Sequence, residues 1–276
     1  MELERAEKPL RQMRSLLKRI AETPAPEEVH RLRTRARKVE AIAGALKSID
    51  PRATKRLLKA IKPIRKAAGA VRDMDVLAGN LLAMPRQQLG DSLVKLEEHL
   101  GATRKASAGK LMSVIDEQRR KARQRLKSYA QEIESAASGK KPVKRDVAQA
   151  MDSTTGSDSH ADRLAGELTR WPALTHDNLH AFRLKVKELR YVLQTFPQAS
   201  KEFIDALGKV KDQIGGWHDW EQLLGIARQV LDPQVDRELL QHIEGTSRQK
   251  FMQALAGANT LRQRYLGAGV QERKRA

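Results

Sequence analysis

The sequence predicts an all-α protein built from two similar helical halves. Apolar residues recur every three or four positions, and a segment near residue 30 recurs near residue 180. Aromatic residues make up only 4% of the chain, and many of the apolar residues are Ala and Leu. Strands enrich for β-branched and aromatic residues, so this composition favours packed helices. With 276 residues, 40% of them hydrophobic, the chain can form one large domain or two fused bundles.

A helix is predicted over residues 27–46. Its apolar positions follow a 3-4-3-3-4 spacing that places them on one face, and they are Val29, Leu32, Ala36, Val39, Ile42 and Leu46. Pro26 suits the first helical turn, and Glu27 and Glu28 suit the positive end of the helix dipole.

The next helix is expected to begin at Pro51, with Asp50 as its N-cap. Pro63 and Gly69 predict that this helix bends or breaks, because neither residue favours a helix interior. Residues 91–135 then predict further long helices.

A linker is expected from about residue 139 to residue 163. This segment is rich in Ser, Thr, Gly and Asp, and helical periodicity resumes after it. The first helical half is therefore predicted over about residues 1–138 and the second over about residues 164–276.

The second half repeats motifs of the first. Residues 29–40 and 179–190 align at an offset of 150 and share the pattern H-x-x-R-x-x-x-(R/K). The paired residues are His30 and His180, Arg33 and Arg183, and Arg37 and Lys187. Residues 69–77, with the element G-x-x-R-D, align with residues 215–223 at an offset of 146. Two copies in one chain imply two similar bundles, and a seam between them is a natural ligand cleft.

The repeated pattern places a basic stripe beside the apolar face of each helix. His30, Arg33 and Arg37 lie at i, i+3 and i+7, each one residue beyond an apolar position and so about 100° round the helix from it. The second stripe contains His180, Arg183, Lys187 and Arg190, and a further stripe contains Lys55, Lys59, Lys62 and Lys66. Basic helix faces are usually solvated surfaces, and a His beside an apolar face is usually structural. Recurrence at the same phase relative to the core favours an anion ligand instead.

The charge of the chain points to an anionic partner. The formal net charge is +19, from 53 Lys and Arg against 34 Asp and Glu. Residues 1–140 hold 32 basic and 17 acidic residues, a net charge of +15, and the remainder contributes +4. We therefore expect the first half to attract anions more strongly.

Several kinds of chemistry are excluded or disfavoured. The chain has no Cys, which excludes disulfides, thiolate chemistry and zinc held by Cys. Residues 1–30 lack the apolar stretch of a signal peptide, and no run reaches the about 18 apolar residues of a membrane span. We therefore expect a cytoplasmic protein without membrane association.

Motifs of the common catalytic classes are missing from the sequence. It has no Gly-rich phosphate loop followed by Lys-Ser or Lys-Thr, no G-x-S-x-G and no H-E-x-x-H. His176 and His180 lie four residues apart, but no third metal ligand is evident. Asp73 and Asp75 are expected to pair with Arg72 and neighbouring Lys. The sequence thus predicts no enzyme, no cofactor and no metal site.

Through these motifs the sequence resembles the CHAD family, the conserved histidine α-helical domain, over residues 25–266. The resemblance rests on the two H-x-x-R-x-x-x-(R/K) starts, on G-x-x-R-D and on its partner K-D-Q-I-G-G-W-H-D. It implies two pseudo-symmetric four-helix bundles around a basic groove or pore. It also implies binding of inorganic polyphosphate and, in some members, association with polyphosphate granules. Glu40 and His218 depart from the family pattern, and the 276 residues contain no segment that resembles the CYTH domain found in many members.

The resemblance and the stripes together define the expected polyphosphate-binding residues. They are His30, Arg33, Arg37, Lys55, Lys59, Lys62, Lys66, Arg72, Arg123, His180, Arg183, Lys187, Arg190 and Lys211. Lys and Arg along facing helices would give charge-assisted contacts to phosphates. The alternatives are a nucleic-acid-binding protein, whose charge fits but whose stacking aromatics are few, and a helical scaffold for acidic protein partners. An enzyme acting on phosphoanhydrides is a third, weaker alternative.

Overall fold

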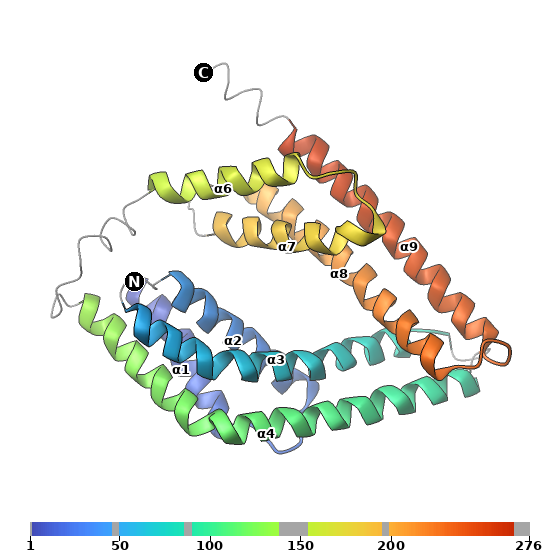
Figure 1. The fold of residues 1–276 in the computed structure, drawn as a ribbon, viewed down its shortest axis with the longest axis horizontal. Helices are drawn as coiled ribbons and strands as arrows, with labels where there is room; N and C mark the ends of the chain where they lie inside the picture. Colours follow the sequence, from blue (N-terminus) through green and yellow to red (C-terminus); the bar gives the residue numbers. More distant parts are fainter. Residues whose placement is uncertain (1, 46–49, 86–89, 138–153, 195–198, 268–276) are drawn as a thin grey trace. The chain divides into compact units, whose positions relative to one another are not determined.

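The all-α fold class is confirmed by the computed structural model, which describes residues 2–45, 50–85, 90–137, 154–194 and 199–267 (Figure 1). Within those ranges there are eight α-helices, one π-helix and no strand. The helices are α1 Glu2–Arg19, α2 Pro26–Ala45, α3 Pro51–Leu82, α4 Gly90–Ala137, α6 Thr154–Thr169, α7 His176–Leu193, α8 Lys201–Val230, α9 Arg237–Leu261 and the π-helix η1 Arg262–Leu266. None of the helices described here has both the length and the apolar character needed to cross a bilayer.

The helices form two compact units, each with its own apolar core. The first unit comprises Met1–Ala83 and Glu97–Asp152, and the second comprises Met84–Leu96 and Ser153–Ala276. α4 therefore contributes its first residues to the second unit and the rest to the first.

A buried carboxylate explains why the start of α4 belongs to the second unit. Asp236, which is only 2% exposed at the start of α9, accepts hydrogen bonds from Ser92 Oγ at 2.6 Å and Lys95 Nζ at 2.9 Å. Leu93 and Leu96, on the same part of α4, are also buried. The sequence analysis predicted a first half that runs continuously to residue 138, and it did not predict that Met84–Leu96 belong to the second unit.

α1 is an element that the sequence patterns left unassigned. Leu10, Met13, Leu17 and Ile20 follow a 3-4-3 spacing, and all four are buried in the core of the first unit. α1 packs along α2, and α2 packs along α3 (Figure 1).

The expected break in α3 is wrong, whereas the N-cap at its start is confirmed. Asp50 Oδ1 accepts hydrogen bonds from the backbone N–H groups of Arg52 and Ala53, each at 2.8 Å. The helix then continues unbroken through Pro63. A proline removes one backbone hydrogen bond, but the flanking Ile61 and Ile64 are fully buried, so tertiary packing holds the helix together.

The second unit begins earlier than the sequence suggested. α6 starts at Thr154, inside the segment expected to be a linker, and residues 138–153 lie outside the described ranges. Phe182 and Trp217 stand in a core built from α6, α7, α8 and α9. The pseudo-symmetric four-helix arrangement of both halves stays a prediction.

Candidate anion-binding surfaces

The first unit carries a cluster of cations where α2 packs along α3. We define the first basic surface as His30, Arg33 and Arg37 of α2 with Arg65 and Arg72 of α3. The apolar positions of α2 beside the stripe, among them Val29, Leu32, Ala36 and Val39, are all 0% exposed. Burial of this apolar face sets the rotation of the helix, and the rotation holds the stripe at the edge of the core.

Arg33 is the centre of the first basic surface. It is only partly exposed, and burial lowers the pKa of its guanidinium, with the charges of Arg37, Arg65 and Arg72 adding to the effect. Asp73 opposes the shift. A guanidinium nevertheless stays charged at physiological pH. Three further guanidinium groups therefore lie close enough to Arg33 to repel its charge, and a bound anion would relieve that repulsion.

One cation of the first basic surface, Arg65, is paired with a carboxylate. Arg65 Nε lies 2.8 Å from Glu40 Oε2 and 2.9 Å from Oε1, and both side chains are largely shielded from solvent. Glu40, a departure from the family pattern, thus neutralises Arg65. The sequence reasoning missed Arg65, although the offset of 146 pairs it with the expected Lys211.

The second unit carries the corresponding cluster where α7 packs along α8. We define the second basic surface as His180, Arg183, Lys187 and Arg190 of α7 with Lys211 and His218 of α8. The apolar positions beside this stripe, Leu179, Phe182, Val186 and Leu189, are buried just as their counterparts are on α2.

Two histidines meet on the second basic surface. The rings of His180 and His218 lie 4.4 Å apart between centroids. His218 occupies the position that aligns with Arg72, so this departure from the family pattern lies beside the histidine of the repeated motif. Burial lowers the pKa of His180, and the neighbouring His218 and Arg183 lower it further. His180 Nδ1 is buried and has no hydrogen-bond partner in the described part of the chain.

The same contact between an arginine and a glycine occurs in both units. A Cβ placed on Gly69 would lie 3.7 Å from Arg33 Nε, and one on Gly215 would lie 3.0 Å from Arg183 Nη2. At Gly215 the missing side chain leaves room for the Arg183 guanidinium, whereas at Gly69 a Cβ would be in ordinary van der Waals contact with Arg33. Arg183 Nε also donates a hydrogen bond to the Lys211 carbonyl oxygen at 3.1 Å. The alignment of the two G-x-x-(R/H)-D elements therefore corresponds to a shared packing contact.

The remaining expected residues are placed in three ways. Lys187 Nζ lies 5.8 Å from the ring centroid of the exposed Tyr191, and Lys211 Nζ pairs with Asp212 at 2.7 Å. Four lysines of α3 are exposed and pair with no carboxylate that the structure describes, namely Lys55, Lys59, Lys62 and Lys66. Arg123 of α4 lies apart from the first basic surface, in a hollow against α1.

The acidic and metal candidates have structural explanations. Asp75 is 3% exposed and pairs with Arg104 Nε at 2.6 Å, so the expected ion pairing is found with a partner other than Arg72. His176 Nε2 lies 3.0 Å from Glu221 Oε2. Over the described ranges, no group of three or more His, Asp or Glu side chains could hold a metal ion.

Comparison with known proteins places the chain in a family. Neither the curated proteins nor the solved structures include a chain that matches it. The family model described as the CHAD domain matches residues 4–257, which takes in both basic surfaces. With its repeated basic stripes, its all-helical fold and this match over most of its length, the chain belongs to the CHAD domain family.

Proposed function

We propose that the protein binds inorganic polyphosphate through the first and second basic surfaces, without turning it over. The CHAD domain is associated with polyphosphate binding in general. The observation that carries the proposal for this chain is the repeated contact of Arg33 with Gly69 and of Arg183 with Gly215. It holds a half-buried guanidinium at the same place in both units, beside further cations.

The charge of the two surfaces suits a linear polyanion. Arg33 and the three guanidinium groups around it lie near the carboxylates of Glu40 and Asp73, and Glu40 is already engaged with Arg65. Arg190 Nε on the second surface is buried and lacks a hydrogen-bond partner among the described residues. A chain of phosphates offers one negative charge and several acceptor oxygens per unit, so it can satisfy such groups in succession. The groove or pore between the bundles stays a prediction.

A titration with polyphosphates of defined length tests the proposal. The variant Arg33→Ala, Arg183→Ala should bind at least tenfold more weakly than the wild type at low salt. The control Lys105→Ala, Lys110→Ala removes two charges from exposed positions on α4 and should bind like the wild type. Equal affinities of all three proteins would overturn the assignment of the surfaces. Release of phosphate with enzymatic turnover in the presence of Mg²⁺ would overturn the proposal of binding without catalysis.

Nucleic acid is the alternative that one observation favours. Tyr191 is 51% exposed beside Lys187, and an exposed aromatic ring next to a cation can stack on a base. Competition by RNA of matched charge decides between the two ligands. Displacement of RNA by polyphosphate at equal phosphate concentration supports polyphosphate as the ligand, and the reverse result supports nucleic acid. Binding of polyphosphate would also direct the protein to polyphosphate granules, which fluorescence microscopy of a tagged chain can test.

A further inference from the structure

A third group of cations lies in the first unit, in a hollow between α1 and α4, and shares no residue with the first basic surface. It is an open hollow of about 510 Å³. Its lining consists of Arg14, Arg119, Arg120, Arg123, Gln124 and Lys127. Five of these six side chains are cations, and none is a carboxylate.

The cations of this hollow are poorly neutralised. Arg119 Nη2 pairs with Asp116 Oδ1 at 3.2 Å, but Asp116 is 68% exposed, and an exposed pair of this kind is weak. Among side chains that the structure describes, Asp116 is the only carboxylate in an ion pair with the five cations. Nearby like charges destabilise the folded chain unless a counter-anion screens them.

Two donors at the hollow are left without acceptors. Arg119 Nε and Arg123 Nε are buried from solvent and make no hydrogen bond to any residue that is described. Buried donors are normally satisfied, and an unsatisfied one points to a missing partner. Guanidinium groups bind oxyanions in bidentate geometry, so a phosphate group entering the hollow would supply acceptors once these side chains turn toward it.

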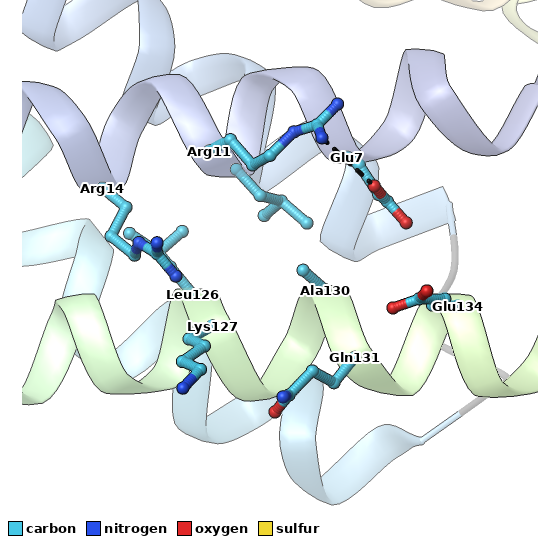
Figure 2. A pocket seen from close by; sticks show the side chains of 9 residues that line it. Glu7, Arg11, Arg14, Leu126, Lys127, Ala130, Gln131 and Glu134 are labelled. Atoms are coloured by element: carbon cyan, nitrogen blue, oxygen red, sulfur yellow. Dashed lines mark ion pairs between the residues drawn. The ribbon is translucent and has the colours of Figure 1, made fainter.

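The charge becomes mixed along the cleft between the two helices, where carboxylates join the cations. A second cavity of about 320 Å³ shares Arg14 and Lys127 with the hollow and continues along α1 and α4 to Glu7 and Glu134. Figure 2 shows Arg14 reaching from α1 toward α4 on the side of Lys127, with Glu7 and Glu134 at the other end. Arg11 pairs with Glu7 at 4.0 Å, but Arg11 is 59% exposed and the pair is weak, so the two carboxylates still make this end less favourable to a long anion than the basic end. The basic end therefore fits a short anion.

We propose that the hollow between α1 and α4 is a separate site for a short oligophosphate moiety, held by Arg14, Arg119, Arg120, Arg123 and Lys127. This inference stands on residues outside the two basic surfaces, although its ligand belongs to the same chemical class. It also gives Arg123 a role other than the one expected from the sequence.

Calorimetric titration with tripolyphosphate tests the site in the full chain. The variant Arg119→Gln, Arg123→Gln should weaken tripolyphosphate binding at least tenfold, whereas Arg33→Ala, Arg183→Ala should change it less than twofold. The control Lys105→Ala, Lys110→Ala lies on the same helix and removes the same charge. Helical content by circular dichroism should match the wild type for each variant, since neither Nε atom holds a structural hydrogen bond.

The outcomes separate this site from the proposed function. Unchanged tripolyphosphate binding in Arg119→Gln, Arg123→Gln overturns the inference, and so does equal weakening in the Lys105→Ala, Lys110→Ala control. Failure of long polyphosphate to bind the wild type would refute the proposed function while leaving the tripolyphosphate result to stand. ATP should bind no more tightly than tripolyphosphate, because the hollow has no aromatic side chain for a base. Binding of ATP without tripolyphosphate binding would overturn the assignment to an oligophosphate.

Discussion

Adding one methyl group at each of the two matched glycines should have opposite effects on stability. In Gly69→Ala the new Cβ lies 3.7 Å from Arg33 Nε, an ordinary van der Waals contact. In Gly215→Ala it lies 3.0 Å from Arg183 Nη2 and 3.3 Å from Nε, so the guanidinium must move. Arg183 Nε donates a hydrogen bond of 3.1 Å to the Lys211 carbonyl oxygen, and we expect this displacement to weaken it.

The magnitudes follow from these two distances. Replacing Gly by Ala inside a helix stabilises it by about 0.5–1 kcal/mol, so Gly69→Ala should be stabilised by about that amount. A hydrogen bond from a charged donor contributes about 1.5–3 kcal/mol, and its loss outweighs the gain in helix propensity. Gly215→Ala should therefore be destabilised by about 1 kcal/mol, and its affinity for polyphosphate should fall because Arg183 is displaced.

Urea unfolding measures both effects. All three Trp residues, Trp171, Trp217 and Trp220, belong to the second unit, so their fluorescence reports the unit that Gly215 occupies. Far-ultraviolet circular dichroism follows Gly69→Ala, since the first unit contains no Trp. If Gly215→Ala is as stable as Gly69→Ala and binds polyphosphate like the wild type, the guanidinium is not held against the helix, and the shared contact carries no functional meaning.

Three further predictions concern protons, an ion pair and salt. Binding at pH 7 should take up protons, because burial, His218 and Arg183 hold the pKa of free His180 below its ordinary 6.5 and a bound phosphate raises it. Affinity should therefore rise as the pH falls below 7. Binding heats in buffers of different ionisation enthalpy should show proton uptake by the wild type but not by His180→Ala. If the wild type takes up no protons, the predicted contact between His180 and phosphate is refuted. Asp75→Asn should lower the free energy of unfolding by about 2 kcal/mol, since Arg104 loses its carboxylate; an unchanged urea midpoint would contradict this. The logarithm of polyphosphate affinity should fall linearly with the logarithm of salt concentration, with a slope of about −4 for roughly six phosphate contacts, and a slope near zero would show that charge does not hold the ligand.

The long helices could be predicted from the sequence because their apolar spacing repeats over many turns. The spacing from Val29 to Val39 predicted both α2 and its buried face, and all four apolar positions that flank the stripe are buried. Local breakers were less informative. Pro63 disfavours a helix by itself, but the burial of Ile61 and Ile64 on either side depends on the rest of the fold and outweighs that preference.

The basic stripes of the candidate site could be predicted because their motif occurs twice in the sequence. The two copies of H-x-x-R-x-x-x-(R/K) located the stripes, and their phase predicted that each stripe flanks an apolar face, which is buried on both helices; that the stripes bind an anion stays a prediction. Arg65 was missed because it stands outside both motifs. Helical spacing grouped the lysines of α3 on one face, but it could not show that this face is turned outward, since Lys59 is about 200° from the buried Leu57. Likewise, the sequence contains no sign that Arg123 faces α1.

The ion pair between Glu40 and Arg65 makes the two repeats differ in how they meet a ligand. In the first unit, Arg65 is already paired with Glu40. In the second unit, the equivalent of Glu40 is Arg190, whose Nε has no hydrogen-bond partner among the described residues. On the proposed function, a phosphate chain would therefore meet an arginine already paired with a carboxylate in the first repeat and an arginine with an unused donor in the second.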